Sequence, residues 1–259
     1  VDGKDLIIYS SAISMENPEL AKAKELGIPA VTRAQALGAL MAEYDSSIAI
    51  SGTHGKTTTT SMVSLILKNA HKEPTILVGG NLPEINGNVY VGQNDYFVTE
   101  ACEYMDSFLN LKPKIEIILN IDSDHLDYFK DVEHIARSFD KFAKLVPQNG
   151  AVIAYDANPF VKSVISGLPN AITFGLSESC DYYASDINFN NDGMPQFHVN
   201  HGGKALCQIY LLLCGQKRDF TDFLQVHTYR VIYRNILGNS GFQIDFLSFR
   251  VFCDNGIHF

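Results

Sequence analysis

The residues that most constrain the fold are Ile48–Thr60, which read IAISGTHGKTTTT. A short apolar run leads into a glycine turn, and a segment of helix length follows the turn. Such a turn can surround phosphate oxygens with backbone N–H groups, while a lysine neutralises their charge and a Ser or Thr hydroxyl reaches a magnesium ion. The residues that supply these parts are Gly52, Gly55, Lys56 and Thr57. The segment predicts a variant phosphate-binding loop, because its two glycines are only three residues apart.

Apolar runs typical of buried strands alternate with helical segments, which favours a parallel α/β sheet. The expected strands are Leu6–Ser10, Ile28–Thr32, Ile48–Ile50, Tyr96–Thr99, Ile115–Leu119, Ala151–Tyr155 and Ala171–Phe174. The expected helices are Pro18–Leu26, Arg33–Met41, the segment from the glycine turn to about Ala70, and Val132–Val146. The last two carry apolar stripes at helical spacing: Val63, Ile66, Leu67 and Ala70, then Ile135, Phe139, Phe142 and Val146.

After Asp181 the chain changes to short strands separated by turn signals. Tyr182–Phe189, Gln196–Asn200 and Ala205–Leu213 are separated by Asn-Asp-Gly and Gly-Gly, which predicts an antiparallel hairpin or three-stranded sheet. The expected fold class is therefore α/β: a parallel sheet of the P-loop type flanked by helices, with a small antiparallel sheet appended.

Composition excludes several classes of protein. With 46% hydrophobic and 19% charged residues, the chain is globular and not disordered. Its net charge of −9 argues against nucleic-acid binding, which relies on Lys and Arg. No apolar run approaches the roughly 20 residues that span a bilayer, so we expect no membrane insertion. No secretory signal is visible, and the five cysteines form no CxxC pair, which favours reduced thiols in the cytoplasm.

Polar residues directly follow two other expected strands. Glu100 comes after Tyr96–Thr99, and Asn120–Asp127 (NIDSDHLD) comes after Ile115–Leu119. Because ligands bind beyond the carboxyl ends of strands in an open α/β sheet, we expect these residues near the glycine loop. A carboxylate there would form a magnesium site with Thr57, whereas the imidazole of His125 is a less usual magnesium ligand.

Simpler interpretations of the same residues stay open. Glu100 could be an ordinary acid at a strand end, and His125 alone would more often be structural than a ligand. For Asp122 and Asp127 we favour solvated loop acids.

The run Thr57–Thr60 is unusual at the start of a helix. Four β-branched residues in succession lower helix stability, so we expect some of the hydroxyls to act at the phosphates. Thr57 and Thr58 are the best candidates.

Three segments together resemble the Mur ligase family: Gly52–Thr60 (GTHGKTTTT), Thr99–Leu109 (TEACEYMDSFL) and Asn120–Phe129 (NIDSDHLDYF). His54 favours the members that act on L-alanine, since relatives carry Asn at this place. The resemblance covers residues 1–213. It implies the remnant of an N-terminal UDP-binding, Rossmann-like domain at residues 1–45 and a central ATP-binding domain at residues 46–213.

The resemblance implies a ligase of peptidoglycan precursor synthesis that uses ATP and Mg²⁺. In that family the carboxylate of UDP-N-acetylmuramate takes the γ-phosphate of ATP, and the amine of L-alanine then displaces phosphate from the acyl phosphate. The implied ATP-binding residues are Gly52, Thr53, His54, Gly55, Lys56, Thr57 and Thr58. The implied metal ligands are Thr57 and Glu100 for one ion and His125 for a second, with Lys56 and His125 catalytic and Asn81 and Asn120 on the substrate side.

Two other functions stay open. A related ligase attaches a recycled peptide to the same sugar nucleotide, and a P-loop module could bind nucleotide without ligation. The sequence does not give the oligomeric state.

Residues 214–259 differ from the rest of the chain. Up to Leu213 there are 13 lysines and 2 arginines, whereas Cys214–Phe259 has 1 lysine, 4 arginines, no alanine, no proline and no glutamate. The resemblance also stops there, because the family continues with Pro-Gly-x-His-Asn and a third domain. At the other end of the chain, the glycine-rich turn with which the family binds UDP has no counterpart before residue 1. A divergent segment is one interpretation. We favour a frame-shifted translation outside the family pattern, and we expect this chain to have little or no ligase activity.

The frame-shift hypothesis for residues 214–259 makes a prediction about the coding DNA. A shifted reading frame downstream of codon 213 is expected to encode Pro-Gly-x-His-Asn, and resequencing checks this directly. An intact frame across codon 214 with no such stretch in any frame would refute the frame shift.

Overall fold

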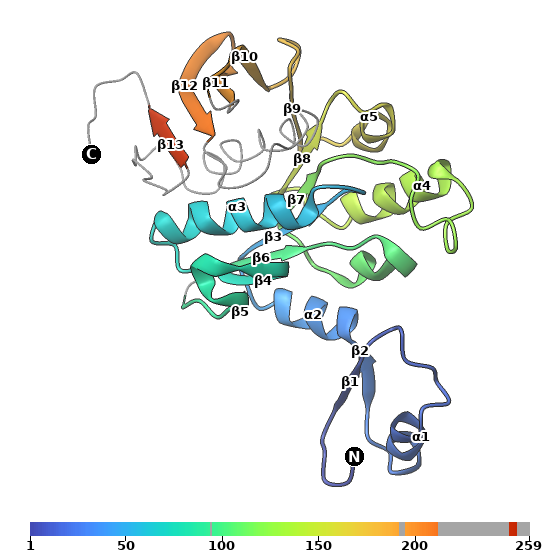
Figure 1. The fold of residues 1–259 in the computed structure, drawn as a ribbon. Helices are drawn as coiled ribbons and strands as arrows, with labels where there is room; N and C mark the ends of the chain where they lie inside the picture. Colours follow the sequence, from blue (N-terminus) through green and yellow to red (C-terminus); the bar gives the residue numbers. More distant parts are fainter. Residues whose placement is uncertain (94, 192–194, 212–248, 253–259) are drawn as a thin grey trace.

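The computed structural model describes residues 1–93, 95–191, 195–211 and 249–252. Its centre is an 11-stranded sheet in the order β13-β12-β11-β10-β9-β8-β7-β3-β6-β4-β5 (Figure 1). The strands are β3 (Ser46–Ser51), β4 (Thr75–Leu82), β5 (Gly87–Tyr90), β6 (Tyr96–Glu100), β7 (Ile115–Ile118), β8 (Ala151–Tyr155), β9 (Ala171–Gly175), β10 (Tyr182–Phe189), β11 (Pro195–His201), β12 (Lys204–Leu211) and β13 (Phe249–Phe252). Neighbouring strands are parallel from β4 across to β10, and the pairs outside this range are antiparallel.

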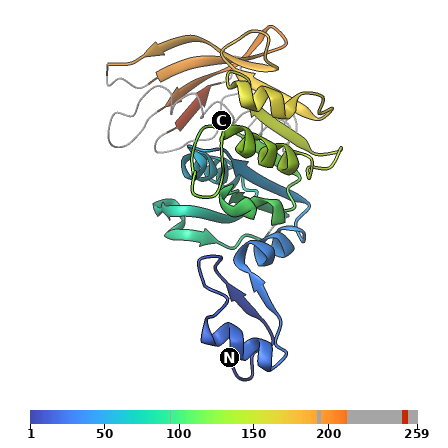
Figure 2. The same cartoon turned by 90° about the vertical axis from the view of Figure 1, so that its right-hand side faces the viewer.

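A small N-terminal unit lies at one end of the molecule (Figures 1 and 2). It contains the parallel pair β1 (Ile7–Tyr9) and β2 (Ala30–Thr32) with the helix α1 (Pro18–Glu25). The helix α2 (Arg33–Met41) joins it to the central sheet by packing against the 3₁₀ segment η2 (Tyr104–Asn110). A Cβ on Gly38 of α2 would lie 1.8 Å from the carbonyl oxygen of Asn110, so only glycine permits this close contact between the two backbones.

Helices cover both faces of the parallel part of the sheet. The long helices are α3 (Lys56–Asn69) and α4 (Val132–Ala143), and α5 (Pro159–Ile165) is short. The expected stripes are largely confirmed: Val63 and Leu67 of α3 join one core cluster, and Phe139 and Phe142 of α4 join the cluster on the opposite face. Val146 is also buried in the second cluster, but it lies beyond α4, which ends at Ala143 and not at Val146 as expected. Within the described ranges, no helix is long and apolar enough to cross a bilayer.

The expected α/β class is confirmed, but the sequence did not indicate the strands β4, β5 and β13, the helix α5, or the 3₁₀ segments η1 (Pro83–Ile85) and η2. The strands β4 and β5 were missed because β4 contains Gly79, Gly80 and Asn81, which are rare in strands. The helix α5 was missed because it has only 7 residues, although Asn158 caps it and Pro159 opens it. The antiparallel strands are also no separate sheet, because β10 pairs in parallel with β9.

The structure describes little of the tail. Within residues 214–259 it gives β13, which pairs antiparallel with β12. The rest of the tail lies outside the described residues, and both interpretations of this segment stay predictions.

A fully buried carboxyl group lies inside the sheet on β7. Glu116 is 0% exposed, and its Oε1 accepts a hydrogen bond of 3.0 Å from the Ser51 hydroxyl at the end of β3. Its Oε2 has no hydrogen-bond partner among the described residues. Burial disfavours the charged form and raises the pKa of Glu116 from 4.5 to about 8, an effect that the Ser51 hydrogen bond only partly offsets.

This pKa predicts a pH-dependent stability. The unfolded chain loses the Glu116 proton near pH 4.5 and the folded chain only near pH 8. Stability is therefore fully present below pH 4.5 and falls by about 1.4 kcal/mol per unit as the pH rises to about 8. The variant E116Q cannot ionise, so its free energy of unfolding should lack this loss. Urea unfolding between pH 5 and 9 measures the difference.

The control is E43Q, which neutralises an exposed glutamate on the same chain. Its stability curve should run parallel to that of the wild type. Parallel curves for the wild type and E116Q would instead show that Glu116 is already ionised, or remains in contact with solvent, in the folded state.

Candidate functional site

The glycine turn between β3 and α3 depends on two positive φ angles. Gly52 has φ 137° and Gly55 has φ 85°, and a Cβ on Gly52 would lie 2.9 Å from the Leu119 Cβ. Gly55 is also the N-terminal cap of α3 and provides no side chain to cap it. The turn therefore presents the N-terminus of a 14-residue helix, with its partial positive charge, at the carboxyl edge of the sheet.

The segment after β7 holds this turn in place. The Asn120 Oδ1 accepts from the His54 N–H at 2.8 Å, and the Asn120 Nδ2 donates to the His54 carbonyl at 3.1 Å. The Thr53 hydroxyl accepts from the Asp122 N–H at 2.9 Å. The amide of Asn120 thus serves the loop itself, and its expected place on the substrate side stays a prediction.

Lys56 lies folded over the turn. Its Nζ donates to the carbonyl oxygens of Gly52 at 2.5 Å and Thr53 at 3.2 Å. It also forms an ion pair with Glu103, with the Nζ 2.9 Å from Oε2 and 3.1 Å from Oε1. Glu103 is 1% exposed, so the pair joins the loop lysine to a buried carboxylate.

Glu100, at the end of β6, faces the start of α3. Its Oε2 accepts from the Thr57 hydroxyl at 3.1 Å, and its Oε1 accepts from the Gly79 N–H of β4. A Cβ on Gly79 would lie 2.8 Å from both carboxylate oxygens, which explains a glycine inside a strand. Asn81 lies exposed further along β4, and its role stays a prediction.

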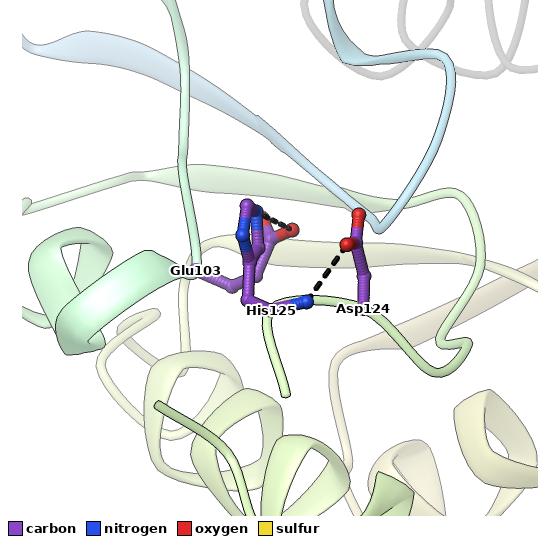
Figure 3. A group of neighbouring side chains, drawn as sticks. All are labelled: Glu103, Asp124 and His125. Atoms are coloured by element: carbon purple, nitrogen blue, oxygen red, sulfur yellow. Dashed lines mark hydrogen bonds and ion pairs between the residues drawn. The ribbon is translucent and has the colours of Figure 1, made fainter. Parts of the chain in front are cut away.

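A second group of polar side chains surrounds His125. One ligand atom from each of Glu103, Asp124 and His125 lies within 4.8 Å of the others (Figure 3). The ring Nε2 of His125 is 3.8 Å from the Glu103 Oε1. The Asp124 carboxylate accepts a hydrogen bond of 2.7 Å from the backbone N–H of His125. His125 has φ 50°, a left-handed conformation that histidine adopts more readily than bulky or branched residues. The ring of Tyr104 lies 4.7 Å from the imidazole and restricts it.

The donors suit a hard divalent cation. Carboxylate oxygens of Glu100, Glu103 and Asp124, with the Thr57 hydroxyl, are the ligands that Mg²⁺ prefers, and Mn²⁺ also accepts imidazole. These donors fall into two groups, because Glu100 pairs with Thr57 whereas Glu103 approaches His125.

Sequence reasoning missed Glu103 and Asp124 as site residues. Glu103 lay in the segment Thr99–Leu109 that carries the family resemblance, and Asp124 lay in the acidic run expected near the glycine loop, but neither residue was singled out. The threonine run also divides: Thr57 is exposed at the site, whereas Thr59 and Thr60 are buried and their hydroxyls have no hydrogen-bond partner among the described residues. Only the beginning of the run can therefore contact a ligand.

Known proteins resemble this chain over most of its length. The Mur ligase middle domain matches residues 50–217, and the segment named "Mur ligase family, catalytic domain" matches residues 1–45. The UDP-N-acetylmuramate–L-alanine ligase of Caldanaerobacter subterraneus subsp. tengcongensis is 49% identical over 217 residues, which are 83% of this chain and 47% of that protein. The chain thus spans about half the length of the curated relatives it matches.

Two solved structures share the fold. UDP-N-acetylmuramate-alanine ligase MurC from Thermotoga maritima has a TM-score of 0.74 at 25% identity, covering 90% of this chain and 51% of that one. The UDP-N-acetylmuramate:L-alanyl-gamma-D-glutamyl-meso-diaminopimelate ligase from Neisseria meningitides has a TM-score of 0.72 at 23% identity, covering 86% and 72%. The glycine loop, the strand order and these matches agree, and the chain belongs to the Mur ligase family.

Proposed function

We propose that this chain is the ATP- and Mg²⁺-binding part of a ligase that joins L-alanine to the carboxylate of UDP-N-acetylmuramate. One observation carries the proposal: the helix N-terminus, Lys56, Glu100 and the group around His125 meet at the carboxyl ends of the adjacent strands β3, β6 and β7. A phosphate cradle beside carboxylates is the arrangement that phosphoryl transfer requires.

Each residue has a distinct task in this proposal. Backbone N–H groups of Gly52–Thr58 surround the phosphates of ATP, and Lys56 stabilises the transferring phosphoryl group. Thr57 and Glu100 hold one magnesium ion, and His125, with Glu103 and Asp124, holds a second. Bound magnesium neutralises negative charge on the phosphates.

The reaction needs no covalent bond to the protein. The substrate carboxylate attacks the γ-phosphorus of ATP, ADP leaves, and an acyl phosphate forms. The amine of L-alanine then attacks the acyl carbon and displaces phosphate, which leaves an amide. The residues of this chain act in the first step, by holding the phosphates and compensating their charge.

Relatives favour L-alanine as the amine substrate. Proteins 48–50% identical to this chain are named as L-alanine ligases, whereas the similar structure of a peptide-joining ligase is 23% identical. That ligase and a nucleotide-binding module without ligation remain the alternatives. The proposal also includes three further points. Asn81 and Asn120 lie on the substrate side, the domain limits are 1–45, 46–213 and 214–259, and the protein is cytoplasmic.

The metal assignment predicts the behaviour of Thr57. Mg²⁺ should lower the Kd for ADP in the wild type by a factor about ten times larger than in the variant T57A, because the variant lacks the hydroxyl ligand. Isothermal titration with ADP, with and without Mg²⁺, measures this. The control S61A removes a hydroxyl from the next turn of α3, where the Ser61 Oγ donates to the Thr57 carbonyl, and should behave as the wild type does. Equal losses in both variants would contradict the assignment.

The chain alone should show little ligation. We expect nucleotide binding but no alanine-dependent phosphate release from ATP and UDP-N-acetylmuramate, because the family places amino-acid recognition in a further domain. A coupled phosphate assay on the purified chain measures this, with each substrate omitted in turn. Phosphate release that requires a peptide amine in place of L-alanine would favour the peptide-joining alternative, and release without the sugar would favour a simple ATPase.

A further inference from the structure

The inference concerns Glu103, a carboxylate with two competing partners. Among the described acidic residues, Glu103 and Glu116 are the ones buried to this degree. Glu103 lies at the start of η2, directly beside the glycine turn, and its Oε1 approaches both the Lys56 Nζ, at 3.1 Å, and the His125 Nε2, at 3.8 Å. This one oxygen therefore contacts the lysine of the loop and also lies near the group around His125.

The contacts that Lys56 makes within the chain use its full hydrogen-bonding capacity. An ammonium group has three N–H donors. Lys56 has three sets of acceptors: the carbonyls of Gly52 and Thr53, and the carboxylate of Glu103. A phosphate oxygen can bind this ammonium only if one of these acceptors gives way.

Burial determines which exchange is possible. A carboxylate that is 1% exposed cannot lose its cation without another positive charge, because an unpaired buried charge is strongly unfavourable. The Asp124 carboxylate and His125 imidazole lie within ligand distance of Glu103 and could hold such a charge with it (Figure 3). A divalent cation at this place would replace Lys56 as the partner of Glu103.

We propose that Glu103 is a positioning residue that exchanges Lys56 for a divalent cation. This rests on the function proposed above. Without a cation Glu103 holds Lys56 against the turn. When a cation binds between Glu103, Asp124 and His125, the carboxylate turns to the metal and the ammonium becomes available to the phosphates. The cation thus favours nucleotide binding through the lysine as well as through its own charge.

The first test needs no nucleotide. Acetic anhydride acylates accessible amines, and mass spectrometry of the peptide containing Lys56 gives the rate at this residue. Mn²⁺ alone should raise the Lys56 rate in the wild-type chain about tenfold, and E103Q should react about tenfold faster than the wild type in EDTA. The control E84Q neutralises an exposed glutamate outside the site and should match the wild type. Rates unchanged by Mn²⁺ in the wild type overturn the proposal even if E103Q does not fold.

The second test separates positioning from simple metal ligation. In EDTA, E103Q should bind ADP about tenfold more tightly than the wild type, because Lys56 is released. With Mn²⁺ the order should reverse, because the variant has lost a cation ligand. Weaker binding by E103Q in both conditions, or a change confined to the Mn²⁺ condition, overturns the exchange. ADP binding in the wild type would still support the proposed function, whereas no binding by any variant would refute that function as well.

Discussion

Two hydrogen bonds between Asn120 and the His54 peptide fix the geometry of the whole site. They tie the glycine turn, which follows β3, to the segment that follows β7, so both strand ends share one rigid edge. The close approach at Gly52 tightens the same junction, since a Cβ there would meet Leu119. Residues further along that segment, Asp124 and His125, are consequently held near the start of α3. This junction links the loop to Asp124 and His125, whereas Glu100 and Glu103 reach the loop directly through Thr57 and Lys56.

The strand order explains why the charges gather here. β3 lies between β6 and β7, so side chains that follow these strands surround the start of α3 from both sides. Glu100 reaches it from β6, and β4 contributes the Gly79 N–H to the same carboxylate. Parallel strands place several chemically active residues at one edge although they are far apart in the chain.

The sequence was informative where a residue type reports its local backbone. The glycine turn, the helix after it, Glu100 and His125 were all placed at strand ends, and the structure brings them together. Glu103 was not predicted, because nothing local distinguishes it from an exposed acid; its importance arises from contact with Lys56, 47 residues away. Gly79 likewise made β4 look unlike a strand, and the reason for this glycine is the Glu100 carboxylate. Predictions of such residues are limited because their roles depend on contacts between distant strands, which the propensities of single residues do not report.

The two buried glutamates show how environment determines what one chemical group can do. Among the described residues, the carboxyl group of Glu116 has only the Ser51 hydroxyl as a partner, so burial raises its pKa and favours the neutral acid. Glu103 lies against the ammonium of Lys56, which compensates a negative charge at almost equal burial. A neutral acid has no charge to offer a cation, and its role is confined to the sheet. A carboxylate paired with a flexible lysine can accept a different cation when the lysine leaves, because the stem of Lys56 allows its ammonium group to move. The position of a mobile positive charge, more than burial itself, therefore separates a structural carboxyl from one that can take part in ligand binding.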